Sequence, residues 1–256
     1  MKPLLSVISY NRRAETCETL RSLGITGALE DADYIVWDNG SVDGTADMLR
    51  GMVESGFLEW DRVFLSQENI GCPKALNAIL YSWRKSGQHF IKVDNDVVLE
   101  TPDWVIKLVA FLEQQPTVAL ASAWYVELDG SEYGRFKTDH GGWHEVFPVV
   151  GHCAIHRGSF LDRAGYFDVL APDHLYGFED LLMANRAVVM GHKCAVVPEV
   201  RLRNIQRHSS LDVGEHEGER MRKHVERLRP EYERRKHWIH SLGCRYYVSP
   251  SGSPVL

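Results

Sequence analysis

Cysteine is scarce in this chain of 256 residues, and long hydrophobic runs are absent. The five cysteines are scattered and show no C-x-x-C spacing, which excludes a disulfide framework and a zinc site built on paired thiols. No apolar segment approaches the roughly 18 residues that cross a bilayer, and the apolar stretch at the N-terminus is too short for a signal peptide. We therefore expect reduced thiols, no transmembrane segment and a cytoplasmic protein.

Two glycine-rich nucleotide-binding motifs are missing as well. No G-x-G-x-x-G follows the first apolar run, and no G-x-x-x-x-G-K-S/T occurs anywhere in the chain. The first absence excludes a Rossmann dinucleotide site, and the second excludes a P-loop. Any nucleotide must therefore be bound by loops of another kind.

Charge is distributed unevenly along the sequence. Residues 1–199 hold 17 Lys and Arg against 28 Asp and Glu, whereas residues 200–256 hold 12 against 7 and include five histidines. This asymmetry indicates either an anionic partner for the basic tail, such as a membrane surface or a polyanionic acceptor, or a solvated helix whose charges pair with one another.

Short apolar runs alternate with helix-like stretches over the first 125 residues. Strands that alternate with helices predict an α/β fold with a mostly parallel central sheet, flanked by helices and connected by right-handed crossovers. Ligands in such sheets bind beyond the carboxyl ends of the strands. The expected strands are Leu4–Ser9, Tyr34–Asp38, Val63–Ser66, Phe90–Val93 and Val118–Trp124, and the expected helices are Ala14–Leu23, Ala46–Ser55, Ala75–Trp83 and Trp104–Leu112.

The chain changes character after residue 125. Glycine-rich and aromatic segments between residues 125 and 160 indicate loops and antiparallel excursions. A helix is then expected at Glu179–Met190 and a strand at Cys194–Val197. The tail from Glu215 to about His240 has the composition of a polar helix, which Pro230 is expected to interrupt.

The most informative motif is Asp94-Asn95-Asp96, which follows an apolar run. A strand puts residues i and i+2 on the same face, so a turn at its end can aim both carboxylates at one point. Mg²⁺ and Mn²⁺ prefer oxygen ligands and commonly bind through one or two carboxylates together with substrate phosphates. The motif therefore predicts either a metal site for a diphosphate or a solvated turn that closes the strand.

Polar loops also follow the other expected strands, and their content suits a mononucleotide. Asp38 is suited to accept a hydrogen bond from a base N–H, and Tyr10 is suited to flank that base. Lys74 or Arg12 would neutralise phosphate.

Together these motifs resemble the family 2 glycosyltransferases, which have the GT-A fold. The resemblance covers roughly residues 4–205, and its strength lies in several motifs that occur in the family's order. The matching segments are Val7–Arg12, Val36–Thr45, Asn69-Ile70-Gly71 with Lys74 and Asn77, Asp94-Asn95-Asp96, Gly165–Asp168, Glu179-Asp180, and Arg186 with Gly191.

The resemblance implies a domain organisation. Residues 1–205 would form the GT-A domain, with a nucleotide-sugar-binding half at residues 1–125 and an acceptor-side half at residues 126–205. Residues 206–256 would form a short, basic, helical C-terminal extension.

The resemblance also implies roles for individual residues. Asp94 and Asp96 would bind a divalent metal, either Mg²⁺ or Mn²⁺. Asp180, next to Glu179, would be the catalytic base that takes a proton from the acceptor hydroxyl, although on its own the pair is typical of an acidic first helical turn. The nucleotide sugar would be bound by Ser9, Tyr10, Arg12, Asp38, Asn69, Gly71, Lys74, Asp94 and Asn95.

The third metal ligand departs from the family pattern, in which a histidine follows the strand near Pro198. That position holds Asn204 here, and His208, four residues later, is the candidate ligand. His152 and His156 have the even spacing that puts both on one face of a short strand. They predict either a second metal site or ordinary packing.

The expected reaction transfers a sugar from a nucleotide diphosphate sugar, a UDP-hexose, to a hydroxyl acceptor with inversion at the anomeric carbon. The candidate acceptors are a glycan or lipid-linked saccharide, a protein side chain, and a nucleic acid with hydroxymethylated bases. The basic tail would serve nucleic acid binding or peripheral membrane contact.

Two other classes stay open. A sugar nucleotidyltransferase shares much of this architecture, but its glycine-rich N-terminal phosphate loop is missing here. The second is a non-catalytic carbohydrate-binding protein of the same fold, and the intact Asp94, Asp96 and Asp180 argue against it.

Overall fold

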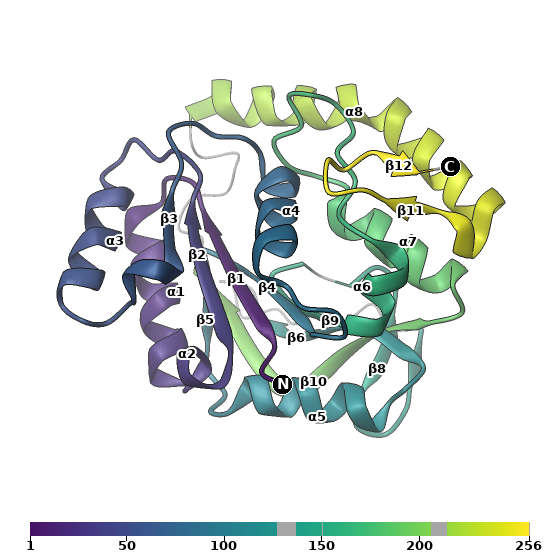
Figure 1. Ribbon diagram of the computed structural model, residues 1–256, viewed down its shortest axis with the longest axis horizontal. Coiled ribbons are helices and arrows are strands. Elements are labelled where there is room, and N and C mark those ends of the chain that lie inside the picture. Colours follow the sequence, from purple (N-terminus) through teal and green to yellow (C-terminus); the bar gives the residue numbers. More distant parts are fainter. Residues whose placement is uncertain (127–136, 150, 206–213, 256) are drawn as a thin grey trace.

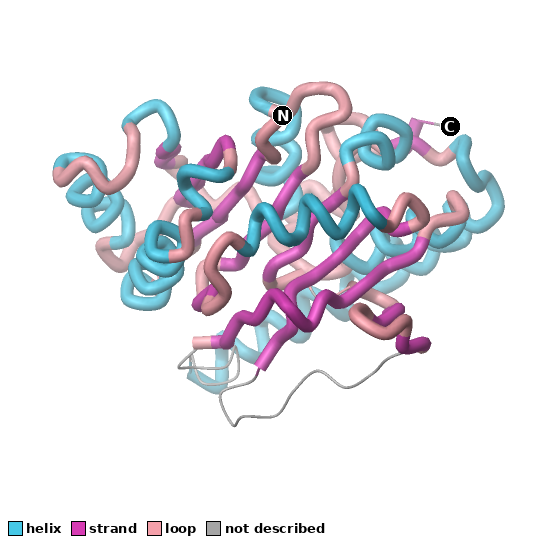
Figure 2. Tube along the Cα trace, turned by 90° about the horizontal axis from the view of Figure 1, so that it is seen from below, coloured by secondary structure: helices cyan, strands magenta, loops and turns pink. Residues whose placement is uncertain are grey.

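The computed structural model describes residues 1–126, 137–149, 151–205 and 214–255, and it has the expected α/β architecture (Figures 1 and 2). The described residues form a ten-stranded sheet in the order β3-β2-β1-β4-β9-β6-β10-β8-β7, with β5 paired to β10. A separate hairpin joins β11 to β12. The strands are β1 (Leu4–Ser9), β2 (Asp33–Asp38), β3 (Val63–Leu65), β4 (Phe90–Asp94), β5 (Val97–Leu99), β6 (Val118–Val126), β7 (Thr138–Asp139), β8 (His144–Val146), β9 (Cys153–His156), β10 (Lys193–Asn204), β11 (Tyr247–Val248) and β12 (Pro254–Val255).

Four neighbouring strands form a fully parallel region. β1 pairs in parallel with β2 and with β4, and β2 pairs in parallel with β3. The predictions for these four strands are confirmed. They could be made because a strand buried on both faces appears in the sequence as a near-continuous apolar run. The helices are α1 (Arg13–Ile25), α2 (Ala28–Asp31), α3 (Thr45–Glu54), α4 (Cys72–Trp83), α5 (Trp104–Gln114), α6 (Gly158–Ala164), α7 (Glu179–Val189) and α8 (Gly214–Leu242), with 3₁₀ turns η1 (Trp60–Arg62) and η2 (Gly243–Arg245).

The middle of the sheet is mixed. β9 is inserted between β4 and β6 and runs antiparallel to both. A strand that follows β6 and pairs parallel to it would need a crossover connection, usually a helix. The described part of the connection from β6 to β9 contains no helix, which agrees with their antiparallel pairing. The insertion brings the start of β9 to the end of β4, where the Asp94 N–H donates to the His152 carbonyl at 2.9 Å.

Helices cover both faces of the sheet, as Figures 1 and 2 show. On one face, buried side chains of α1, α2, α3 and α5 pack with Leu5 and Val7 of β1. On the other face, α4, α6 and α7 pack with Leu4 of β1 and Phe90 of β4. Side chains alternate along a strand, so Lys92 shares the face of Phe90 and points to the side of α4 and α7.

The C-terminal extension packs on the domain through a third cluster of buried side chains. α8 lies along α7 (Figure 1), and its Leu228, Tyr232 and Ile239 are buried in this cluster. α8 continues through Pro230, so the expected interruption is wrong. Buried side chains on both sides of Pro230 belong to one cluster, and this packing keeps the two parts in one helix. No helix among the described residues is both long enough and apolar enough to cross a bilayer.

A buried polar network fastens the extension to the domain. The Tyr246 hydroxyl donates to Asp168 Oδ1 at 2.6 Å, and Arg235 Nη1 donates to the same oxygen at 3.2 Å. Arg186 Nη2 lies 3.5 Å from Asp168 Oδ2. A buried charge is costly unless it is paired and hydrogen-bonded, so Asp168 requires partners from both the domain and the extension.

His156 on β9 makes the stability of the fold depend on pH. Its ring is fully buried between Phe90 and Phe167, and burial lowers its pKa from 6.5 to about 4. His156 therefore takes up a proton more readily in the unfolded chain than in the folded protein. Its contribution to the free energy of unfolding is present in full above pH 6.5 and is lost as the pH falls toward 4.

Replacement of His156 tests this pH dependence. We expect His156→Phe to remove up to about 3 kcal/mol of the loss in unfolding free energy, measured by urea unfolding across the same pH range.

The exposed His237 on α8 supplies the control for this experiment. His237→Phe should leave the pH dependence of the unfolding free energy unchanged. An equal pH dependence in the wild type and in His156→Phe would contradict the assignment.

Candidate active site

A cleft with a volume of 540 Å³ opens beyond the carboxyl ends of β1 and β4. α4 and α7 begin at the same edge of the sheet, so their first residues, Cys72 and Glu179, line the cleft. The full lining consists of Ser6, Ile8, Tyr10, Asn11, Arg12, Asn39, Asn69, Cys72, Lys92, Val93, Asp94, Asn95, Asp96, Gly151, His152, Leu175, Tyr176, Glu179 and Asp180.

The Asp94-Asn95-Asp96 turn between β4 and β5 is fixed by several elements. Its first N–H is bonded to the segment before β9, and the Ile205 N–H donates to the Asp96 carbonyl at 2.8 Å. The Asn95 amide donates to Thr16 Oγ1 of α1 at 2.9 Å. These contacts hold the turn so that both of its carboxylates lie at the cleft.

Asp94, Asp96 and His152 form a cluster suited to a divalent metal. One potential ligand atom from each lies within 4.8 Å of the other two, and no other group of three such side chains was found among the described residues. Two carboxylate oxygens and an imidazole nitrogen suit Mn²⁺, and the carboxylates also suit Mg²⁺. The His152 ring stacks on Tyr125 with 4.6 Å between centroids, and its Nδ1 lies 3.1 Å from Asp94 Oδ2.

This cluster adds His152 as a candidate for the third ligand, beside the predicted His208. His152 is the histidine that joins the two aspartates, whereas His156 is fully buried between two phenylalanine rings and has the packing role. His208 lies outside the described residues. Asn204 donates to the Tyr125 hydroxyl at 3.1 Å and so supports the ring on which His152 stacks.

Burial and neighbouring charges set the protonation of this cluster. Burial tends to raise the pKa of Asp94, but the Lys92 ammonium and His152 outweigh it and lower this pKa to about 2. Burial and repulsion from Asp94 raise the pKa of Asp96, although Arg12 pairs with it. Burial tends to lower the pKa of His152, but its contact with Asp94 raises it. A bound divalent cation would relieve the repulsion between the two carboxylates.

A buried lysine, which we did not single out from the sequence, links the acidic groups. Lys92 is 5% exposed, and its Nζ lies 2.6 Å from Asp180 Oδ2, 3.6 Å from Asp94 Oδ1 and 3.9 Å from Glu179 Oε1. The sequence did carry a signal, because a charge at the centre of an apolar strand is almost never buried without a partner. Lys92 thus connects the metal cluster with the start of α7.

Glu179 and Asp180 differ in their surroundings. Burial raises the pKa of Glu179 to about 7, although the nearby Lys92 lowers it. Asp180 Oδ2 accepts a hydrogen bond from Lys92, whereas Asp180 Oδ1 is buried and has no hydrogen-bond partner among the described residues. The Asp180 side chain as a whole is 24% exposed and lines the cleft, so a ligand in the cleft can reach this carboxylate.

The predicted nucleotide-binding residues fall into two groups. Tyr10, Arg12, Asn69, Asp94 and Asn95 line the cleft, and Ser9, Asp38, Gly71 and Lys74 do not. The first group is placed to touch a ligand directly.

The second group holds the loops behind the lining. The buried Asp38 accepts a hydrogen bond from Ser9 Oγ and one from the Ser41 N–H, both at 3.1 Å. Gly71 has a φ of +91°, and a Cβ there would lie 2.0 Å from the backbone oxygen of His174. Lys74 donates to the Pro172 carbonyl. Nucleotide contacts from these residues stay predictions.

Comparison with known proteins decides the family. The sequence pattern of glycosyl transferase family 2 matches residues 5–164, which is more than half of the chain. This chain belongs to glycosyl transferase family 2. Membership of this family is what its motifs indicate.

Among curated proteins, this chain is similar to the uncharacterized glycosyltransferase YfnE of Bacillus subtilis (strain 168), with 29% identity over 176 residues. The match covers 64% of this chain and 43% of YfnE. The chain thus spans less than half the length of this relative.

Solved structures confirm the GT-A fold. PcManGT, a mannosyltransferase from Pyrobaculum calidifontis solved with GDP-Man and Mn²⁺, has a TM-score of 0.61 and 20% identity, over 94% of this chain and 70% of PcManGT. GalNAc-T7, solved with UDP, GalNAc and Mn²⁺, has a TM-score of 0.61 and 16% identity, over 80% of this chain and 44% of that protein. S. aureus TarS 1–349, solved with UDP, has a TM-score of 0.59 and 20% identity, over 84% of this chain and 63% of the TarS chain.

Removal of the His152 imidazole tests the metal cluster. We expect His152→Ala to weaken Mn²⁺ binding at least about tenfold, since even changes beside metal ligands commonly cost that much. Calorimetric titration of the purified protein with Mn²⁺ measures the effect. His237→Ala, on the exposed side of α8, is the matched control. Equal Mn²⁺ affinity in the wild type and in His152→Ala would remove His152 from the cluster.

Gly151 gives Asp180 and Lys92 their space. A Cβ at Gly151 would lie 1.9 Å from Asp180 Oδ2 and 2.9 Å from Lys92 Nζ. Gly151→Ala should therefore displace the carboxylate and lower kcat about 100-fold, the effect of a small misplacement in an active site. Gly51→Ala is the control, because a Cβ at Gly51 of α3 meets nothing within 4 Å. Equal turnover in both variants would show that the position of Asp180 is unimportant.

Proposed function

We propose that this glycosyltransferase moves a hexose from UDP to a hydroxyl group of a saccharide acceptor, with inversion at the anomeric carbon and Asp180 as the general base. One observation carries the proposal. Lys92 lies between Asp180 and Asp94 at 2.6 and 3.6 Å, so the proposed base and the metal cluster face the same cleft within the reach of one side chain.

The metal cluster supports the donor part of the proposal. Asp94, Asp96 and His152 would hold Mn²⁺ or Mg²⁺, and the bound ion would offset the charge that develops on the diphosphate leaving group. Arg12, paired with Asp96, brings a further positive charge to this edge of the cleft. The structures of GalNAc-T7 and TarS contain UDP and that of PcManGT contains GDP-Man, so UDP is the first donor nucleotide to test.

The contacts of Asp180 support its role as the base. Lys92 orients the carboxylate through Oδ2, and the side chain is 24% exposed at the cleft, where it would accept the proton of the acceptor hydroxyl. The acceptor oxygen would attack the anomeric carbon on the side opposite UDP while the bond from that carbon to the diphosphate oxygen breaks. A single displacement of this kind inverts the configuration. Glu179 would position the acceptor by hydrogen bonding, in either protonation state, because its pKa is about 7.

The charges of α8 favour a saccharide acceptor over a nucleic acid. Several positive side chains on this helix pair with acidic neighbours, as Arg234 does with Glu231 and Arg227 with Asp173. Binding to DNA depends on cationic groups that can neutralise phosphates, and pairs of this kind would first have to separate. A free or lipid-linked saccharide makes no such demand on the extension.

A donor screen tests the proposed function. The purified protein is incubated with UDP-, GDP- and dTDP-hexoses, with Mn²⁺ or with a chelator, and the released nucleoside diphosphate is measured. Metal-dependent release from a UDP-hexose is the expected result. Release from a GDP- or dTDP-sugar alone would contradict the donor, and an NMR spectrum that shows retained configuration in the product would contradict inversion.

Substitution of Asp180 tests the base. Asp180→Asn should lower kcat by about 10²- to 10⁴-fold, the usual contribution of general base catalysis, with little change in donor binding. Glu179→Gln should act mainly on the KM for the acceptor. Asp47→Asn on α3, where the side chain is 83% exposed, is the control. Nearly normal kcat in Asp180→Asn would assign the base elsewhere.

A further inference from the structure

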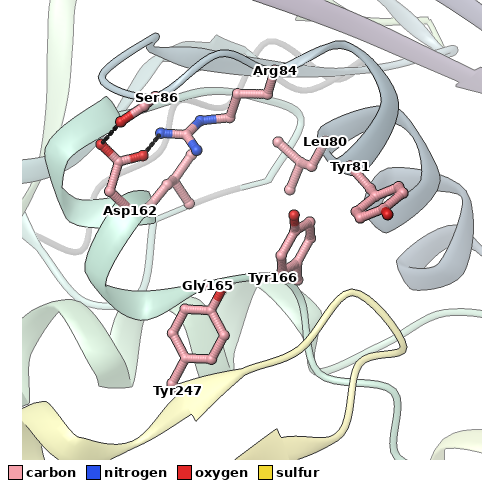
Figure 3. Close-up of a pocket in the computed structure, with 9 residues that line it drawn as sticks. Leu80, Tyr81, Arg84, Ser86, Asp162, Gly165, Tyr166 and Tyr247 are labelled. Atoms are coloured by element: carbon pink, nitrogen blue, oxygen red, sulfur yellow. Dashed lines mark hydrogen bonds and ion pairs between the residues drawn. The ribbon is translucent and has the colours of Figure 1, made fainter.

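A second cavity lies at the opposite end of α4 from the catalytic cleft. It has a volume of 290 Å³, and residues from α4, α6, the segment after α6 and β11 line it, among them Tyr81, Arg84, Tyr166 and Tyr247 (Figure 3). α4 begins with Cys72 in the catalytic cleft, and its 12 residues span about 18 Å. The cavity is therefore separate from the donor site.

Arg84 is fixed in one wall of this cavity. Its Nε donates to the Gln88 carbonyl at 3.0 Å, and its Nη2 donates to the Gly158 carbonyl at 2.7 Å. The same Nη2 donates to Asp162 Oδ1 at 2.6 Å (Figure 3). Asp162 also accepts from Ser86 Oγ at 3.2 Å. The wall is therefore preorganised and its charges balance, while Arg84 Nη1 has no hydrogen-bond partner in the described part of the chain.

Three tyrosines supply the rest of the cavity's polar groups. Tyr81 is 69% exposed on the last turn of α4, and Tyr166 and Tyr247 are half-buried. Within the described ranges, none of the three hydroxyls has a hydrogen-bond partner in the protein. Their rings and hydroxyls are therefore available to a ligand.

The C-terminal hairpin places Tyr247 in this cavity. The Tyr166 N–H donates to the Val248 carbonyl at 3.0 Å. A Cβ at Gly165, whose φ is +80°, would lie 2.1 Å from the Val248 oxygen and 2.9 Å from the Tyr247 ring. The glycine thus lets β11 approach closely, and this contact sets the ring of Tyr247 against the domain.

We propose that this cavity is a subsite for one unit of a neutral saccharide. Because Asp162 balances Arg84, the wall has no excess positive charge to attract a phosphate. Tyrosine rings pack well on the C–H face of a sugar, and phenol hydroxyls and Arg84 Nη1 can hydrogen-bond its hydroxyl groups. Concave sites with aromatic walls and a few fixed polar groups are typical of small-molecule binding.

The choice of ligand rests on the proposed function, because an enzyme that extends a saccharide encounters sugar units beyond the one that reacts. A unit bound about 18 Å along α4 from the cleft is far from the transferred sugar. The subsite would therefore hold a distant part of the acceptor or product chain and would not take part in the reaction itself.

Fluorine NMR provides a direct test in the 256-residue chain. The ten tyrosines are labelled as 3-fluorotyrosine, and the signals of Tyr81, Tyr166 and Tyr247 are assigned by single substitutions to Phe. The probes are the methyl glycosides of glucose, galactose, mannose and N-acetylglucosamine, together with cellobiose, lactose and chitobiose. Saturable shifts of the Tyr81 and Tyr247 signals, with no donor present, are the expected result.

Variants separate this cavity from the catalytic cleft. Tyr81→Ala should weaken saccharide binding about fivefold, the effect of losing one aromatic contact. Trp60→Ala, at a ring that is 58% exposed on η1, and Asp96→Ala in the metal cluster should leave binding unchanged. Either control variant losing as much affinity as Tyr81→Ala would overturn the proposal.

Other outcomes are also decisive. Shifts confined to Tyr10 and Tyr176 of the catalytic cleft, saturation by inorganic phosphate in place of sugars, or no saturable shift with any probe would overturn the subsite. The donor-release assay reports separately on the proposed function. Normal release without shifts at Tyr81 would remove only the subsite, whereas saturable shifts without release from any donor would remove only the transfer function.

Discussion

The arrangement of the active site depends on one buried positive charge. The Lys92 ammonium lies among the carboxylates of Asp94, Glu179 and Asp180, and without it three acidic groups would repel one another in the cleft. Lys92 is on the central strand β4, where it is in register with Ser6 of β1. The most constrained part of the sheet therefore sets the distance between the metal cluster and the proposed base.

The two halves of the cleft have different origins. The parallel strands β1, β2 and β3 end in the loops that carry Tyr10, Asn39 and Asn69, whereas the mixed region contributes His152 through the inserted strand β9. α7 adds Asp180 from the face that Lys92 shares. β4 lies between these regions, so under the proposed function a donor held by one half would meet an acceptor held by the other at the end of a single strand.

Sequence reasoning located the parts of the site that local patterns encode. Apolar runs predicted β1 to β4, and the Asp94-Asn95-Asp96 spacing marked the end of β4. That His152 joins the two aspartates was not predicted, because its position depends on antiparallel pairing between distant segments, which hydrophobic periodicity does not report. Ligation by His208 stays a prediction. Lys92 stood out as a charged residue in an apolar strand, but the sequence around it does not predict its partner Asp180, which is 88 residues away. Likewise, nothing near Lys74 predicts its bond to the backbone of Pro172, 98 residues along the chain.

The network around Asp168 has a consequence for synthesis on the ribosome. Arg186 is translated soon after Asp168, but Arg235 and Tyr246 follow 67 and 78 residues later. The described lining of the catalytic cleft, in contrast, is complete at Asp180. Once β10 and Ile205, which holds the Asp96 carbonyl, have been made, a nascent chain can assemble this cleft while the third cluster of buried side chains is still open to water. Apolar side chains of α7 stay exposed during this interval, and such surfaces are what chaperones bind and what aggregation begins from.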